Sequence, residues 1–325
     1  MKSALIIGIS GQDGAYLSRL LLDKGYRVAG TSRDAQMASM RNLKALDVQE
    51  RVRVHSASST DFRGLWQVLE KERPDEIYNL AGQSSVGLSF EQPMETFESV
   101  AASTLNILEL LRLLGRPVRF YNACSSECFG NTDQPATEDT PFRPRSPYAV
   151  AKAASFWAVA NYREAYGMFA CNGILFNHES PLRPTRFVTR KIIAAACRIA
   201  AGSGERLELG NTAVVRDWGW APEYVDAMWR MLQTGTPRDF VIATGQSFSL
   251  MDFVARAFAA LGLDHTQHVD TRQDLLRPAD IQVSRADPSR ARDILGWRAA
   301  KAMPQVVDAM VACERERLSA QEIRT

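Results

Sequence analysis

Short apolar runs alternate with amphipathic stretches through the first half of the chain, and this alternation limits the folds available to it. Each apolar run has the length of a buried strand, and most are separated by a stretch long enough for a helix. The expected strands are ALIIGI (4–9), YRVAGT (26–31), VRVHSA (52–57), EIYNLAG (76–82) and VRFYNACSS (118–126). Strands that alternate with helices in this way predict an α/β protein with a doubly wound parallel sheet.

The second half of the chain is less regular and richer in Arg, Pro and Trp, as expected of a substrate-binding part. We place the boundary near residue 175. This gives one domain over residues 1–175, to which some later segments cross back, and a smaller domain over residues 176–325.

The charge balance argues against nucleic acid or a membrane surface as a partner. The 325 residues include 39 basic and 37 acidic side chains, which are interspersed and give a formal net charge of +2. The N-terminal apolar run is too short for a signal peptide or a membrane span. The five cysteines form no CxxC pair and the four histidines are scattered, so we expect neither a disulfide framework nor a zinc site. These features favour a cytoplasmic enzyme that acts on small molecules.

A glycine-rich loop, GISGQDG, follows the first expected strand and precedes the first expected helix. Gly8, Gly11 and Gly14 allow a tight turn and a close approach of the backbone to a pyrophosphate, whose charge the helix N-terminus binds. A tight structural turn is the plainer alternative. The position at a strand–helix junction favours dinucleotide binding.

The residues after the second expected strand indicate which nicotinamide cofactor binds. An acidic side chain there binds a ribose hydroxyl, whereas a basic one binds a 2′-phosphate. Ser32 and Arg33 favour NADP, and Asp34 leaves NAD as the alternative. Arg33 as a solvated surface charge is the plainer explanation.

Tyr148 and Lys152 lie four residues apart in SPYAVAKAAS, so one face of a helix that begins near Pro147 would carry both. A free phenol has a pKa of about 10 and is a poor base near neutral pH. A neighbouring ammonium stabilises the phenolate, which can then take a proton from a sugar hydroxyl while its carbon gives up hydride. The alternative is a surface Tyr and Lys on an amphipathic helix.

A second group of polar residues, Ser125, Ser126 and Glu127, follows the strand VRFY. Ligands of open parallel sheets bind at this carboxyl end of the strands. A simple hydride transfer needs the hydroxyl but has no task for the glutamate. An elimination does, because oxidation of one ring carbon makes the adjacent C–H acidic, and Glu127 could remove that proton. A helix-capping Ser and a solvated Glu form the plainer explanation.

Together with several longer motifs, these residues resemble the GDP-mannose 4,6-dehydratases, which belong to the extended short-chain dehydrogenase/reductase family. The resemblance extends from about Ser3 to about Trp297, and FACNGILFNHESP is its most specific part. The other motifs are GQDGAYL, EIYNLAGQSSV, PFRPRSPYAVAK, NYREAYG, FVTRKI and RDWGWAPEYVDAMW.

The resemblance implies a Rossmann-type domain, a smaller sugar-nucleotide domain and tightly held NADP. In that family, C4 of GDP-mannose is oxidised, water is lost across C5 and C6, and the hydride returns to C6. The product is GDP-4-keto-6-deoxymannose, so such an enzyme is a lyase that regenerates its cofactor. The resemblance also implies a homodimer or homotetramer, in which the helices near 96–114 and 149–166 can pair between subunits.

The resemblance assigns roles by position. It implies catalytic roles for Ser125, Glu127 as the acid and base at C5 and C6, Tyr148 as the C4 base and Lys152 as its partner. The implied cofactor contacts are Gly8, Ser10, Gly11, Gln12, Asp13, Gly14, Arg33, Ser58, Leu80, Ala81, Gln83, Ser84, Tyr148, Lys152, His178 and Arg183. The implied substrate contacts are Ser85, Asn177, Val188, Lys191, Arg216 and Arg277. For the two arginines, an ordinary surface salt bridge is the alternative to phosphate binding.

Four departures from the family pattern bear on these roles. The segment SRDAQMASM (32–40) lacks the family's paired arginines, which meet the cofactor and a neighbouring subunit. Ser58 replaces an aspartate expected at the adenine, and Ser85 replaces a histidine near the sugar. Ser125 replaces threonine but keeps the hydroxyl, so we expect the chemistry to survive.

Two other functions stay open on the sequence. A GDP-sugar 4-reductase or epimerase would keep Tyr148 and Lys152 but would not need Glu127. A non-catalytic nucleotide-binding protein would be expected to have damaged catalytic positions, whereas all four catalytic positions carry chemically competent side chains.

Overall fold

The computed structural model describes residues 1–322, and its centre is a parallel sheet of seven strands. The strands, from one edge to the other, are β10 (Phe240–Ile242), β6 (Ala170–Leu175), β5 (Arg119–Ser125), β4 (Glu76–Asn79), β1 (Ser3–Ile7), β2 (Arg27–Ser32) and β3 (Arg53–Ser56). The chain adds strands first on one side of β1 and then, from β4 onward, on the other side. The predicted α/β fold with a doubly wound parallel sheet is confirmed.

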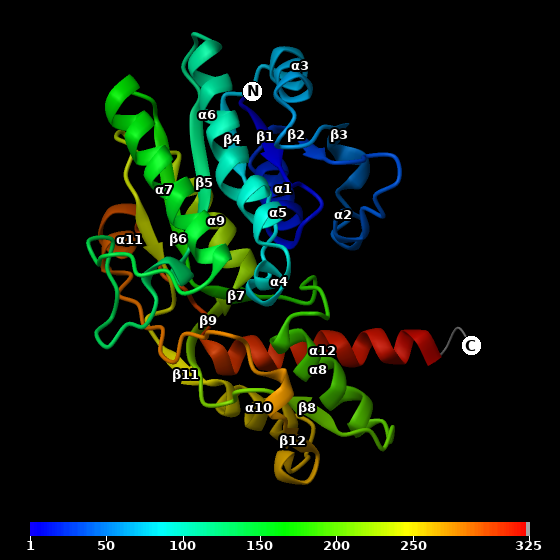
Figure 1. Cartoon of the computed structure of the whole chain (residues 1–325). Helices are drawn as coiled ribbons and strands as arrows, with labels where there is room; N and C mark the ends of the chain where they lie inside the picture. Colours follow the sequence, from blue (N-terminus) through cyan, green and yellow to red (C-terminus); the bar gives the residue numbers. More distant parts are fainter. Residues whose placement is uncertain (323–325) are drawn as a thin grey trace.

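Helices cover both faces of this sheet (Figure 1). One face packs against α1 (Gln12–Asp23) and α9 (Ala221–Met231), whose apolar residues share one core with the strands. The other face packs against α3 (Phe62–Glu72), α6 (Ser103–Leu113) and α7 (Pro147–Tyr166). Burial on both faces explains why the strands appear in the sequence as continuous apolar runs.

The second half of the chain forms a smaller α/β region below the sheet in Figure 1. Its helices α8, α10 and α12 pack around a separate apolar core. The strands β11, β9 and β7 form one small sheet, and β8 pairs with β12. The bounds are β7 (Asn177–Glu179), α8 (Val188–Ala200), β8 (Leu207–Leu209), β9 (Val215–Trp220), β11 (Ser247–Ser249), α10 (Leu250–Ala259), β12 (Val269–Thr271) and α12 (Met303–Glu322). The domain boundary at residue 175 stays a prediction.

Shorter elements connect these parts. The remaining helices are α2 (Arg41–Ala45), α4 (Val86–Glu91), α5 (Pro93–Phe97), a π-helical turn (Glu98–Ala102) and α11 (Ser289–Leu295). Single 3₁₀ turns span Gln49–Arg51, Ser126–Phe129, His265–Gln267 and Gln273–Leu275. Within residues 1–322, no helix combines the length and the apolar composition that crossing a bilayer requires.

Candidate active site

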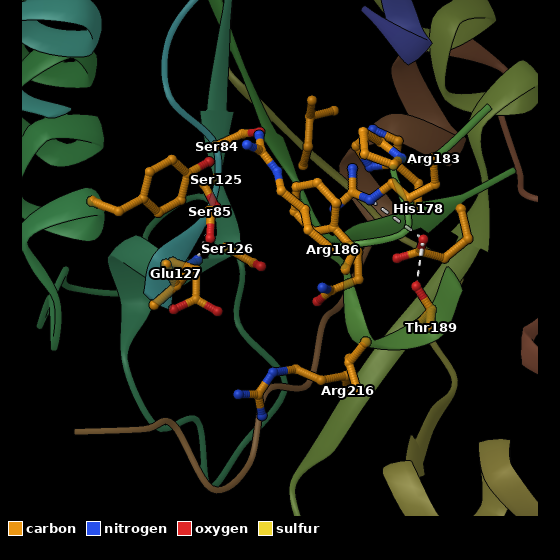
Figure 2. A pocket seen from close by; sticks show the side chains of 18 of the residues that line it. Ser84, Ser85, Ser125, Ser126, Glu127, His178, Arg183, Arg186, Thr189 and Arg216 are labelled. Atoms are coloured by element: carbon orange, nitrogen blue, oxygen red, sulfur yellow. Dashed lines mark hydrogen bonds and ion pairs between the residues drawn. The ribbon is translucent and has the colours of Figure 1, made fainter. Parts of the chain in front are cut away.

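A cavity of about 860 Å³ lies at the carboxyl ends of β1, β4, β5 and β6 and is bounded on its other side by β7, α8 and β9. The strand order reverses between β1 and β4, and parallel sheets place ligands at such a reversal. All predicted site residues line this cavity except Ser10, Arg33 and Ser58. Figure 2 shows Ser84, Ser125 and Glu127 on one wall and His178 and Arg183 on the opposite wall.

The glycine loop leaves room for a ligand because side chains are absent where the backbone packs most closely. Gly8 has a φ of +91°, and a Cβ there would lie 3.0 Å from the Ala81 backbone. A Cβ on Gly14 would lie 2.5 Å from the Gly8 carbonyl oxygen. Helix α1 begins at Gln12, and Gly11 before it supplies no side-chain cap. The first-turn amides therefore suit a pyrophosphate, and the loop fits a dinucleotide.

A mostly buried ion pair joins this loop to the second half of the chain. His178 Nε2, on β7, lies 2.9 Å from Asp13 Oδ2, on α1, and His178 Nδ1 lies 2.8 Å from the Phe176 carbonyl oxygen. The imidazole also stacks on the Tyr224 ring at 4.6 Å. Burial acts to raise the pKa of Asp13, but the charge and hydrogen bond of His178 outweigh it, and the pKa is lowered. These two predicted cofactor contacts thus hold two walls of the cavity together.

The loop after β4 is held by its own side chains. Gln83 Nε2 donates to the Ser85 carbonyl oxygen at 2.8 Å and to Thr96 Oγ1 at 3.0 Å. Ser85 Oγ accepts a hydrogen bond from the Leu88 amide at 3.3 Å and so begins α4. Gln83 and Ser85 therefore shape this wall as well as line it.

The three predicted cofactor residues outside the cavity have different surroundings. The Ser10 carbonyl oxygen accepts a hydrogen bond from Asn42 Nδ2 at 2.9 Å. Ser58 Oγ lies 2.9 Å from Thr60 Oγ1. Arg33 is exposed, and among residues 1–322 no carboxylate forms an ion pair with it. The structure thus leaves the Arg33 guanidinium accessible beyond the end of β2.

The neighbouring Asp34 is used by its own loop. Its Oδ1 accepts hydrogen bonds from the backbone amides of Gln36, at 3.0 Å, and Met37, at 2.9 Å. A carboxylate oxygen that caps a turn in this way is less available to a ribose hydroxyl.

Tyr148 and Lys152 both face the cavity from the first turns of α7. Ser146 begins this helix by accepting a hydrogen bond from the Ala149 amide at 3.1 Å, with Pro147 at its first position. Lys152 Nζ donates to the Ala123 carbonyl oxygen at 2.6 Å and lies 5.9 Å from the centre of the Tyr148 ring.

The predicted lowering of the Tyr148 pKa by Lys152 is not found in this arrangement. Burial raises the pKa of the phenol, and a hydrogen bond with Ser125 opposes that rise. Burial also lowers the pKa of Lys152. The ammonium contacts a backbone carbonyl rather than the phenol, so Ser125 is the side chain that favours the phenolate here.

Glu127 is placed by a 3₁₀ turn at the end of β5. The turn begins where Ser125 Oγ accepts a hydrogen bond from the Glu127 amide at 3.3 Å. Burial raises the pKa of Glu127, whereas the positive charges of Arg216 and Arg277 act to lower it. A carboxyl whose pKa is raised suits proton transfer in both directions.

Basic side chains gather opposite Glu127. Arg216, on β9, is 6% exposed and donates from Nη1 to the Val215 carbonyl oxygen at 3.0 Å. Lys191 Nζ, on α8, donates to the Glu208 carbonyl oxygen at 2.7 Å. Arg277 completes the group from the loop after the last 3₁₀ turn. Converging cations of this kind bind a diphosphate, and Asn177 and Val188 line the same part of the cavity.

Sequence reasoning missed an acidic residue within this group. Asp280 Oδ1 lies 3.1 Å from Arg216 Nη2 and 3.6 Å from Arg277 Nη1. The pairing is visible only in three dimensions, because Asp280 and Arg216 are 64 positions apart. In the sequence, the only sign of this acidic partner was that Asp280 follows Arg277 by three positions.

The strand order and the place of the cavity define the class of protein: a Rossmann-type α/β fold with its ligand site at the carboxyl ends of the strands. The structure is similar to that of a dTDP-glucose 4,6-dehydratase from Streptomyces venezuelae with NAD bound, with a TM-score of 0.87 and 22% identity over 98% of each chain. It is also similar to RMD from Pseudomonas aeruginosa complexed with NADPH, with a TM-score of 0.80 and 23% identity over 98% of this chain and 100% of that one.

Within this class, the chain belongs to the GDP-mannose 4,6-dehydratase family, whose model matches residues 5–310. It is 45% identical to GDP-mannose 4,6 dehydratase 2 of Arabidopsis thaliana, over 95% of this chain and 86% of that protein. The family resemblance predicted from the motifs is confirmed.

Replacing Gly14 with Ala tests the cofactor cradle. The added Cβ would lie 2.5 Å from the Gly8 carbonyl oxygen, so the loop must shift, and we expect the Kd for the dinucleotide to rise about 10- to 100-fold. Fluorescence titration of the purified variant measures this. Gly235→Ala is the control, since nothing lies within 4 Å of a Cβ there. If the two variants bind the dinucleotide with equal affinity, the glycine loop is not the dinucleotide site.

Proposed function

We propose that this protein dehydrates GDP-mannose to GDP-4-keto-6-deoxymannose, with NADP as an internally recycled cofactor. Membership of the GDP-mannose 4,6-dehydratase family supports the substrate and the reaction. The protein is then a lyase with the architecture of a dehydrogenase.

One observation carries the choice of reaction. Glu127 opens into the same cavity as Tyr148 and Ser125, and it faces the cations Arg216 and Arg277. A hydride-transfer enzyme has no step for that carboxyl. An elimination next to a ketone requires a group of this kind, between the reacting ring and the diphosphate.

The first half of the reaction uses Tyr148. When bound in the glycine loop, NADP would supply the chemistry of hydride acceptance from C4 and hydride return to C6. The Tyr148 phenolate takes the proton of the C4 hydroxyl, and the Ser125 hydroxyl donates a hydrogen bond that stabilises the phenolate. Lys152, anchored on the Ala123 carbonyl, places a positive charge one helical turn away.

The second half uses Glu127 as both base and acid. Its carboxylate removes the proton from C5, which the C4 ketone has made acidic. The same proton then passes to the C6 hydroxyl, which leaves as water and gives a double bond between C5 and C6. Glu127, which is again a carboxylate, then takes a proton from solvent and delivers it to C5 as C6 is reduced. The raised pKa of Glu127 suits both directions of transfer.

Substrate binding relies on the basic end of the cavity. The guanidinium groups of Arg216 and Arg277 bind the diphosphate, with Lys191 beside them. The distance between this end and Tyr148 is filled by the hexose. Glu127 then lies on the path between the two.

A GDP-sugar 4-reductase or epimerase is the second candidate. Its support is the general similarity of the fold to epimerases, such as a UDP-glucose 4-epimerase from Thermotoga maritima. The presence of Glu127 in the cavity favours the dehydratase.

The cofactor proposal rests on the end of β2. The exposed guanidinium of Arg33 is available to a 2′-phosphate, while the Asp34 carboxylate is engaged by its own loop. Both features favour NADP over NAD.

The protein also acts as a homodimer in this proposal. Large apolar side chains are exposed on the neighbouring helices α5, α6 and α7: Met94, Phe97, Leu105, Leu113, Val150 and Trp157. Helices α6 and α7 pack side by side, so a second copy can form a four-helix bundle with them. A homotetramer would require a second contact surface.

Replacing Glu127 with Gln tests the reaction. The variant should still oxidise C4, seen as reduced cofactor at 340 nm in a single turnover, but product formation should fall about 10²- to 10⁴-fold. Exchange of the C5 proton with deuterated solvent should fall equally. Glu91→Gln, at an exposed site, is the control. Full turnover of the Glu127 variant, detected as 4-keto-6-deoxy product, would refute the proposed elimination.

Replacing Arg33 with Ala tests the cofactor preference. We expect the Kd for NADP to rise about tenfold with little change for NAD, because only NADP carries the 2′-phosphate. Calorimetric titration with each dinucleotide measures the ratio of the two Kd values. Arg51→Ala provides an exposed arginine control. Wild-type protein that prefers NAD would overturn the proposal.

Replacing Trp157 with Arg tests the dimer. Trp157 is 62% exposed on α7, and a buried Trp at an interface typically contributes about 2 kcal/mol or more. We expect light scattering after size exclusion to report a monomer for this variant and a dimer for wild type. Ile294→Arg, on α11, should leave the mass unchanged.

A further inference from the structure

Asp280 lies between the two arginines of the basic end. Its Oδ1 is 3.1 Å from Arg216 Nη2 and 3.6 Å from Arg277 Nη1. The same oxygen accepts a hydrogen bond from the Ile281 amide at 2.9 Å. A backbone hydrogen bond of 2.7 Å from the Val215 amide to the Gln282 carbonyl oxygen fixes this loop beside β9. The position of the Asp280 carboxylate relative to Arg216 is therefore built into the fold.

Glu127 faces the same cations but does not pair with them. Within residues 1–322, no basic side chain lies within ion-pair distance of the Glu127 carboxylate, although Arg216 and Arg277 both act on it electrostatically. The charged and titratable groups that face it are Arg216 from β9, Arg277 and Asp280 from one loop, and Tyr148 from α7. Figure 2 shows the Arg216 side chain directed toward the side of the cavity that carries Glu127.

We propose that Asp280 is a positioning residue for Glu127. By holding the guanidinium groups of Arg216 and Arg277, it prevents these cations from pairing with the Glu127 carboxylate before a diphosphate arrives. This inference rests on the proposed function, because it takes Glu127 as the proton-transfer group and the two arginines as the diphosphate site.

The physical reason is competition between two carboxylates for two cations, the buried Arg216 and the more exposed Arg277. Arg216 is 6% exposed, so water screens its charge poorly and an unpaired guanidinium there is costly. Without Asp280, the remaining carboxylate of this group is Glu127. Pairing would hold Glu127 ionised and turn it away from C5, which weakens it as a base and as an acid.

The same group couples ligand binding to Glu127. Two arginines and two carboxylates balance in charge, and a diphosphate then adds negative charge at the arginines. That addition favours the protonated form of Glu127, so the binding of GDP is accompanied by proton uptake at this residue. Binding of the diphosphate thus raises the pKa of Glu127, which makes the ionised fraction of this carboxyl a stronger base for the C5 proton.

Replacing Asp280 with Asn tests the role through a pH profile. The acid limb of kcat/KM reports ionisation of Glu127 in the free enzyme, and the variant should move it about one unit to lower pH. The acid limb of kcat should move less, because bound diphosphate then occupies the arginines. Asp280→Glu should restore the wild-type profile, and Asp308→Asn, which breaks an ion pair outside the cavity, should not alter it.

A contact made only with the substrate predicts a different result. If Asp280→Asn raises KM equally at every pH and leaves both limbs unmoved, the positioning role is wrong. If Asp280→Glu shifts the limb as far as Asp280→Asn, the charge is not the cause and the proposal also fails. Thermal melting of each variant verifies that the folded enzyme is compared.

Calorimetry with GDP separates this inference from the proposed reaction. In buffers of different ionisation enthalpy, wild-type protein should take up protons on binding GDP near the midpoint of the acid limb, and Glu127→Gln should take up fewer. Equal uptake in the two proteins would overturn the coupling. Failure of wild-type enzyme to convert GDP-mannose would instead refute the proposed function. The calorimetry with GDP would still test the coupling, because it does not depend on turnover.

Discussion

The ion pair between Asp13 and His178 is the interaction on which the site depends. It joins the first turn of α1, where a pyrophosphate is expected, to β7, an edge strand of the small three-stranded sheet. A second bond, from Ser180 Oγ to Gln12 Oε1 at 2.8 Å, runs parallel to it. Because one contact is buried and the other mostly so, they set the distance between the nucleotide wall and the substrate wall firmly.

Proton transfer and phosphate binding are arranged around that junction by burial and charge. Burial raises the pKa of both Tyr148 and Glu127. Specific neighbours oppose that rise: Ser125 acts on Tyr148, and the two arginines act on Glu127. The site therefore tunes its groups through particular contacts rather than through a general positive field. This is consistent with a chain of nearly balanced charge.

Much of the site could be predicted because the family motifs are local. The glycine loop, the Tyr148–Lys152 spacing and the Ser125–Glu127 turn each sit at one strand or helix end, and the sheet brings those ends together. The contact that anchors Lys152 was not predictable, because its partner, the Ala123 carbonyl oxygen, is a backbone atom 29 positions away. Asp280 was missed for the same kind of reason, since its main partner lies on another strand.

The sequence by itself determined the parallel sheet, the cofactor loop and the family, because apolar periodicity, glycine spacing and long motifs are properties of neighbouring residues. Only the tertiary structure decided which charges meet. It placed Arg216 on Asp280 rather than on Glu127, and it turned Lys152 toward a carbonyl rather than a phenol. Such pairings depend on burial and distance between remote segments, which no local pattern encodes.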